Sequence, residues 1–117
     1  MKSYTDLEQS KKLAEILPLE SADMRIGNYV GESGKVDGTN IHYYPKGESF
    51  GAPEIIYAWS LAALLDVLPR IEDFKPVLDL EINCIQYPSD IDLCAIADNP
   101  VDACVAMVEK LKELNLL

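Results

Sequence analysis

The fold is decided by the stretch 77–117, "VLDLEINCIQYPSDIDLCAIADNPVDACVAMVEKLKELNLL". Its apolar residues are first spaced as in a β-strand and then as in an α-helix. Apolar and polar side chains alternate strictly over 78–84, which predicts a strand with one buried face. Residues 91–97 are apolar on both faces and predict a second strand. The turn-forming sequence "PSD" between them favours an antiparallel hairpin.

The last helix is predicted to begin with Asn99 as its N-cap, Pro100 at the first helical position and Asp102 in the first turn. Cys104 lies near this N-terminus, where reactive thiolates are often found. On a helical wheel, however, Cys104 falls near the middle of the apolar arc, where burial raises a thiol pKa and denies access. We therefore expect Cys104 to be a core residue, whose replacement by alanine lowers stability without abolishing function.

Caps and spacing predict two further helices. Thr5 and Glu8 match a capping box at the start of the first helix, which Pro18 ends. Ser60 is the expected N-cap of the second helix, which ends before Pro69. The buried stripe of this second helix follows the i, i+3, i+4, i+7 spacing and consists of Leu61, Leu64, Leu65 and Leu68.

The segment 19–56 differs in kind, because all six glycines lie between Gly27 and Gly51. Within it, "MRIGNYV" (24–30) and "NIHYY" (40–44) have the isoleucine, tyrosine and valine content of short strands. A turn-rich loop separates them, so this segment predicts a loose hairpin.

These elements predict the α+β class, with three helices packed on one face of a small, mainly antiparallel β-sheet. At 117 residues, the chain is expected to form a single domain, residues 1–117, that buries a core without metal or disulfide. The residues predicted to line the core are Leu7, Leu13, Leu61, Leu64, Leu65, Leu68, Leu80, Ile82, Val101, Cys104, Val105, Val108 and Leu111.

The formal net charge of −10 is unevenly distributed. Residues 48–109 hold twelve acidic side chains and two basic ones, Arg70 and Lys75, so this segment alone carries −10. Direct nucleic-acid binding is not expected, because phosphate recognition needs clustered lysine and arginine. An acidic surface supports solubility, and it could also dock a basic partner.

No apolar run approaches the roughly 20 residues of a membrane span, and the N-terminal segment has no apolar core of a secretory signal. The sequence therefore predicts a cytoplasmic protein without membrane association. Its three cysteines are expected to stay reduced in that compartment.

The three cysteines and His42 could in principle form a zinc site. Zinc sites usually supply closely spaced cysteine pairs, whereas the gaps here are ten residues each. A turn symmetric about Ser89 would place Cys84 opposite Cys94, and two neighbouring core thiols are favoured there over a metal or a disulfide. A catalytic role for His42 would need a cysteine beside it, which the sequence does not indicate.

Two other site types fail on their patterns. "GESGK" (31–35) resembles a phosphate-binding loop, but Tyr29 replaces the first glycine and Val36 replaces the serine or threonine after the lysine. The acids of the predicted hairpin do not follow the calcium-loop pattern. No cofactor, metal or catalytic residue is therefore predicted.

The candidate interaction surface combines aromatic and acidic side chains. Aromatic rings often anchor protein interfaces, and exposed acids would select a basic partner. This predicted surface consists of Tyr29, Tyr43, Tyr44, Phe50, Asp79, Glu81, Asp90 and Asp92.

Three stretches, "SYTDLEQSKKLAEILPLESADM" (3–24), "AWSLAALLDVLP" (58–69) and "ADNPVDACVAMVEKLKELNLL" (97–117), carry a resemblance to a known group. The chain resembles short uncharacterised proteins of gut Bacteroides and their phages or mobile elements. This resemblance implies a bacterial or phage setting and an accessory role. It implies no activity and no role for any residue.

The favoured function is that of a small, acidic, non-enzymatic protein-interaction protein. One alternative is an inhibitor whose acidic face mimics nucleic acid and competes for the basic groove of a host protein. A cysteine-dependent enzyme is the less favoured alternative. The sequence is also compatible with a homodimer.

Overall fold

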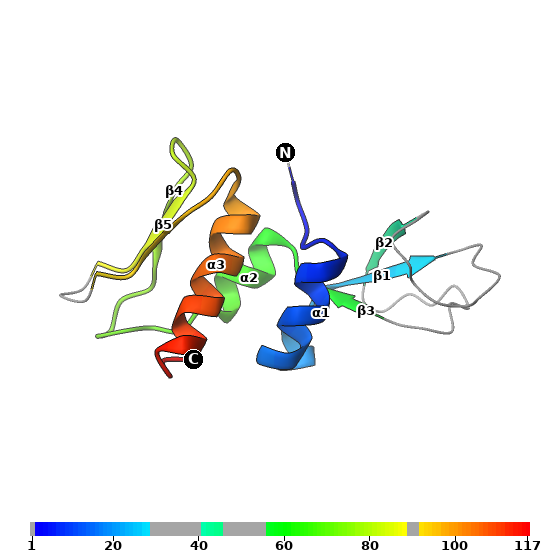
Figure 1. Cartoon of the computed structure of the whole chain (residues 1–117), viewed down its shortest axis with the longest axis horizontal. Coiled ribbons are helices and arrows are strands. Elements are labelled where there is room, and N and C mark those ends of the chain that lie inside the picture. The colour runs from blue at the N-terminus through cyan, green and yellow to red at the C-terminus, as the bar shows by residue number, and fades with distance from the viewer. Residues whose placement is uncertain (1, 29–40, 46–55, 89–91) are drawn as a thin grey trace. The chain divides into compact units, whose positions relative to one another are not determined.

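The computed structural model describes residues 2–28, 41–45, 56–88 and 92–117 (Figure 1). Its helices are α1 (Leu7–Ile16), the short 3₁₀ helix η1 (Leu19–Ser21), α2 (Leu61–Val67) and α3 (Pro100–Glu113). Its strands are β1 (Met24–Asn28), β2 (Ile41–Pro45), β3 (Ile56–Ala58), β4 (Val77–Asp79), β5 (Cys84–Gln86) and β6 (Cys94–Ile96). All strand pairs are antiparallel, so the predicted α+β class is confirmed.

The strands form two three-stranded sheets, in the orders β2-β1-β3 and β4-β5-β6, where one sheet was expected. The chain divides into two compact units, and each unit contains one of the sheets. The α1 unit is Thr5–Ser60, and the α3 unit is Met1–Tyr4 with Leu61–Leu117. The expectation of a single domain stays a prediction.

In the α1 unit, β1 is the central strand and pairs with both β2 and β3. The β1–β2 pair confirms the hairpin predicted from 24–30 and 40–44. Strand β3 was missed, because three residues are too few to show a repeat and their sequence runs into the following helix. The core of the sheet is formed by Ile26, Ile56 and Ala58, against which α1 contributes Leu7.

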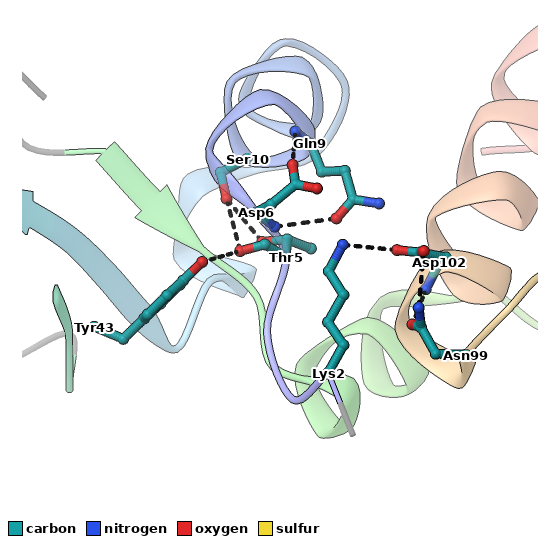
Figure 2. Close-up of polar contacts among 8 residues, drawn as sticks. All are labelled: Lys2, Thr5, Asp6, Gln9, Ser10, Tyr43, Asn99 and Asp102. Atoms are coloured by element: carbon teal, nitrogen blue, oxygen red, sulfur yellow. Dashed lines mark hydrogen bonds and ion pairs between the residues drawn. The ribbon is translucent and has the colours of Figure 1, made fainter. Parts of the chain in front are cut away.

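Helix α1 begins one residue later than its predicted cap. Asp6 is the N-cap: its carboxylate accepts from the backbone N of Gln9 at 2.8 Å, and the Gln9 side chain accepts from the backbone N of Asp6 at 3.0 Å (Figure 2). The predicted Thr5–Glu8 box is therefore wrong. The helix ends at Ile16, before Pro18, as expected.

Thr5 is fully buried and has a different task. Its Oγ1 accepts from the backbone N of Trp59 at 3.0 Å and lies 2.8 Å from the Ser10 hydroxyl. Its carbonyl accepts from the hydroxyl of Tyr43 at 2.9 Å (Figure 2). Thr5 thus joins the start of the α1 unit to β2 and to the residue after β3, while the exposed Asp6 caps the helix.

In the α3 unit, α3 contacts α2 and the strands β5 and β6 (Figure 1). Asn99 caps α3 as predicted: its Oδ1 accepts from the backbone N of Asp102 at 2.9 Å. The Asp102 carboxylate also accepts from Lys2 Nζ at 2.8 Å, which ties the N-terminal segment to this helix (Figure 2). Pro100 occupies the first turn, as expected.

Helix α2 starts directly after Ser60, as the sequence predicts. The Ser60 hydroxyl donates to the Asp23 carboxylate within the α1 unit. At the other end of α2, Lys75 Nζ donates to the Leu68 carbonyl at 2.6 Å. This cation satisfies a carbonyl that the helix itself leaves without a partner.

The strand predicted over 78–84 is wrong, because the chain reverses within it. Strand β4 ends at Asp79, a turn follows, and β5 begins at Cys84. Asn83 has a φ of 52°, the left-handed region that asparagine tolerates better than most residues. Leu80 and Ile82, which were predicted to lie in the core, are instead 62% and 55% exposed.

The hairpin was predicted between strands 78–84 and 91–97; an antiparallel pair is present, but its first strand is β5 (Cys84–Gln86), which shares only Cys84 with the predicted strand, and its register differs. Cys84 pairs with Ile96 and Gln86 pairs with Cys94, so the two cysteines are diagonal neighbours and not directly opposite. Residues 89–91, which include the predicted symmetry point Ser89, lie outside the described residues.

Most of the predicted core is confirmed. Three predicted core residues, Leu7, Leu61 and Leu65, are only half-buried. The predicted core residues that are buried are Leu13, Leu64, Leu68, Val101, Cys104, Val105, Val108 and Leu111. The largest buried side chains that the prediction omitted are Trp59, Tyr87, Ile26, Ile85, Leu93 and Met107.

We expect Thr5→Val to lower the free energy of unfolding by about 1–3 kcal/mol, because the buried backbone N of Trp59 loses its acceptor. Urea unfolding followed by Trp59 fluorescence measures this change. Thr5→Ser is the matched control, since it keeps the hydroxyl and removes one methyl group, at a cost of about 1 kcal/mol. A valine variant at least as stable as the serine variant would contradict the role assigned to the hydroxyl.

Candidate functional site

The two faces of the β4–β5–β6 sheet differ in what covers them. Ile85 and Ala95 lie opposite each other on one face and are buried, and α3 contacts both of their strands. Side chains alternate between faces along a strand, so the flanking positions point to the other side. We call that side the outer face; its residues are Val77, Asp79, Cys84, Gln86, Cys94 and Ile96.

Large apolar side chains are exposed on and beside the outer face. Val77 is 60% and Ile96 65% exposed, and Ile82 projects from the adjoining turn. A cavity of about 190 Å³ lies among them, and it is lined by Val77, Asp79, Ile82, Cys84, Gln86 and Pro88. Exposed apolar groups that gather around a hollow are typical of binding surfaces, whereas isolated ones are ordinary.

Acidic side chains border the same surface. Asp79 and Glu81 are exposed on the β4–β5 turn, where the Asp79 carboxylate accepts from the backbone N of Glu81 at 2.9 Å. Asp92 is exposed at the start of the segment leading to β6. The sequence holds no lysine or arginine from Pro76 to Glu109; Lys110 reaches β6 from α3 and donates to the Cys94 carbonyl at 3.1 Å. The rim is therefore mainly anionic.

Two cysteine sulfurs meet on the outer face. Cys84 Sγ lies 3.1 Å from Cys94 Sγ, and both are free thiols. The hydrogen bond between the two side chains and burial raise the pKa of Cys84 to about 11. Cys84 is therefore a neutral thiol near pH 7.

Cys104 lies in the core, as the helical wheel predicts. It is fully buried in α3, and burial raises the pKa of its thiol from 9.0 to about 11. A buried neutral thiol is a poor nucleophile, so the position near a helix N-terminus does not make Cys104 reactive.

The predicted interaction surface is only partly brought together. Asp79 and Glu81 share one turn, and Asp92 is also exposed in the α3 unit. Tyr43 belongs to the α1 unit, where it is half-buried, packs on the β1 core and donates its hydroxyl to Thr5. Tyr43 therefore has a structural role there.

Several predicted positions cannot be assessed. Tyr29, Phe50 and Asp90 lie outside the described residues. Tyr44 and His42 lie in β2, but their side chains are outside the described part. The aromatic half of the predicted surface, and any pairing of His42 with a cysteine, therefore stay predictions.

The apolar members of the outer face were missed by sequence reasoning. The alternation of 78–84 assigned Leu80 and Ile82 to the core. Asp79 and Asn83, both frequent in turns, were the available signal that the chain reverses between them. Leu80 also borders a second hollow, of about 340 Å³, together with residues at the start of α3.

Among the described residues, no group of three or more histidine, cysteine, aspartate or glutamate side chains is arranged to hold a metal ion. No helix in the described part of the chain has the length and apolar character of a membrane span. No protein-family model, curated protein or solved structure matches the chain.

We expect stability to fall as the pH rises above about 9, because Cys104 loses its proton there only in the unfolded chain. Its pKa in the folded protein is about 11, so the native state binds more protons between these values. The stabilisation that the protonated Cys104 thiol contributes to the folded state is complete below pH 9. It is lost toward pH 11, at roughly 1 kcal/mol of unfolding free energy per pH unit.

Urea unfolding at a series of pH values measures this dependence. At pH 7, Cys104→Ala is expected to cost about 1 kcal/mol through lost packing. Between pH 9 and 11 the variant should lose less stability than the wild type. Tyr87→Phe is the control, because burial raises the pKa of Tyr87 to about 12 and its effect appears at higher pH. Parallel curves for the wild type and Cys104→Ala would contradict the assignment.

Proposed function

We propose that this protein is a small non-enzymatic interaction protein whose outer face binds a segment of another protein. The segment carries a large apolar side chain flanked by lysine or arginine. The observation that carries the proposal is the exposure of Val77 and Ile82 in the lining of a cavity that also contains Asp79, with the exposed Ile96 on the same face, opposite Cys84.

The apolar part supplies affinity. Each of these three side chains is more than half exposed, so a partner that covers them removes apolar surface from water at about 25 cal/mol per Å². The cavity of about 190 Å³ can receive one apolar side chain of the partner. Interfaces are commonly organised around such an anchor, with polar groups at the rim.

The acidic part selects the partner. Asp79 lines the cavity, Glu81 follows it on the same exposed turn, and Asp92 is exposed before β6, while the sequence from Pro76 to Glu109 has no base. An anionic rim attracts cationic segments and repels acidic ones. The same charge disfavours association of two outer faces, which makes a homodimer through this surface the less favoured arrangement.

A nucleic-acid mimic would also present acids to a basic groove. The outer face differs from what mimicry needs, because its acids stand beside large exposed apolar side chains. Salt separates the two cases: purely electrostatic contacts are lost near about 0.5 M salt, whereas apolar contacts persist.

A cysteine-dependent enzyme receives less support, since burial leaves Cys104 without access and Cys84 is a neutral thiol near pH 7. The resemblance to proteins of Bacteroides and their phages supports an accessory role in a bacterial cytoplasm. In that setting the partner is a host or phage protein with an exposed basic and apolar segment.

A display library of short random peptides, screened on the immobilised protein, tests the proposal. We expect enriched peptides to share a large apolar residue flanked by lysine or arginine. Ile82→Ser and Ile96→Ser should each weaken binding about tenfold, as expected for loss of an interface anchor. The double variant Asp79→Asn with Glu81→Gln should weaken binding and reduce its dependence on salt.

Matched controls make the same chemical changes elsewhere in the α3 unit. Leu114→Ser removes an exposed leucine at the end of α3, and Glu72→Gln with Asp73→Asn removes two charges from another turn. Both controls should bind like the wild type. Enriched peptides without basic residues, or equal binding by Ile82→Ser, would overturn the proposal. Salt-sensitive binding independent of Ile82 would favour mimicry, and self-association abolished by Ile82→Ser would assign the face to a homodimer.

A further inference from the structure

The geometry points to Cys84 and Cys94 as a reversible disulfide-forming pair, a redox modification site on the outer face that hydroperoxides oxidise. This inference does not depend on the proposed binding function. It concerns the reduced protein, in which both residues are free thiols.

The two strands already hold the sulfurs close together. Cys84 Sγ and Cys94 Sγ are 3.1 Å apart, and a disulfide needs a separation of about 2.05 Å, so the sulfurs approach by about 1 Å. Cys84 pairs with Ile96, and Cys94 pairs with Gln86 on the same two strands. The two cysteines are therefore diagonal neighbours on paired strands, and a local adjustment of the two side chains and their strands closes the remaining distance.

Oxidant can reach the pair. Cys94 is half-buried, and Cys84 lines the cavity of about 190 Å³ that opens on the outer face. Since Cys94 is the more exposed thiol, it is the sulfur that meets the hydroperoxide first. Cys84, which is more buried, then acts as the resolving thiol.

The chemistry balances with a hydroperoxide as the oxidant. The Cys94 thiolate attacks one peroxide oxygen; an S–O bond forms, the O–O bond breaks, and the departing alkoxide takes the proton that the thiol released. The Cys84 sulfur then attacks the Cys94 sulfenic acid; the S–S bond forms, the S–O bond breaks, and water leaves with the Cys84 proton. The two thiols lose two electrons and two protons, and the hydroperoxide becomes an alcohol and water.

The location favours a regulatory bond over a structural one. The α3 unit is already held by buried side chains from α3 and β5, so it does not need a covalent link. Pairs of this kind respond to oxidant in compartments where thiols are normally reduced. The third cysteine, Cys104, is fully buried in α3 and provides an internal control.

The test treats the full chain with hydrogen peroxide and then blocks the remaining thiols with iodoacetamide under denaturing conditions. We expect the intact mass before blocking to fall by two hydrogen atoms, and dithiothreitol to reverse the change. Peptide mapping should identify a Cys84–Cys94 link, with Cys104 alkylated. Cys104→Ser should still form the link, and Cys84→Ser and Cys94→Ser should each abolish it.

The order of attack has its own readout. Cys84→Ser lacks the resolving thiol, so dimedone should trap a sulfenic acid on Cys94, in a higher yield than on Cys84 in the Cys94→Ser variant. Far-UV circular dichroism, to which the helices of the α3 unit contribute, verifies that each variant is folded, and the wild-type mapping needs no variant at all. Addition of oxygen atoms without loss of two hydrogens, a link that includes Cys104, or a link between two chains would overturn the inference.

Discussion

Asn83 closes the turn between β4 and β5 in a left-handed backbone conformation, with a φ of 52°. Its side chain donates to the Asp98 carbonyl at 2.9 Å, and its own carbonyl accepts from the backbone N of Ala97 at 3.2 Å. These two bonds hold the turn to the segment that leads into α3. Most of the candidate site depends on this reversal, because it pairs β4 with β5 and so brings Val77 and Asp79 beside Gln86 and Cys84, which line the cavity together.

The three cysteines show how position decides the chemistry of one side chain. Cys104 is enclosed by the apolar face of α3 and contributes packing. Cys84 and Cys94 lie on adjacent strands with their sulfurs 3.1 Å apart. The pKa of Cys84 is raised first by the hydrogen bond with Cys94 and then by burial, whereas burial alone raises the pKa of Cys104, which has no second thiol beside it among the described residues. Proximity therefore separates the reactive pair from the inert residue, and the size of the pKa shift does not.

The sequence predicted the parts of the fold that local physics controls. Asn99, Pro100 and the apolar arc of α3 fixed that helix, and the β-rich runs located the β1–β2 pair and the second strand of the β5–β6 pair. Local sequence could not show that Asp6, and not Thr5, is the cap. The Thr5 hydroxyl accepts a hydrogen bond from the backbone N of Trp59, which is distant in the chain. Two sheets in place of one could not be foreseen, since alternation indicates a buried face without saying what covers it.

For the site, the acids Asp79, Glu81 and Asp92 were predicted to be exposed, and they are. Leu80 and Ile82 were assigned to the core. Over seven residues, the alternation of apolar and polar side chains in a strand cannot be told from the same alternation in a strand that ends in a tight turn. The thiol pair was predicted as two neighbours across a hairpin. Its diagonal register depends on the exact length of the turn, which no short motif specifies.

The hydrogen bonds of Thr5 with Trp59 have a topological consequence. The α1 unit is inserted in the chain of the α3 unit, which resumes at Leu61 after leaving at Tyr4. Thr5 N donates to the Trp59 carbonyl at 2.9 Å, so the first and last residues of the α1 unit are close to each other. In the α3 unit, Leu61 N donates to the Ser3 carbonyl at 3.2 Å, so the residues that flank the insertion are also close to each other. An insertion whose ends meet can lengthen, shorten or be exchanged while the host chain keeps its path. A change of length within the α1 unit therefore leaves the start and end points of the α3 unit's chain in place.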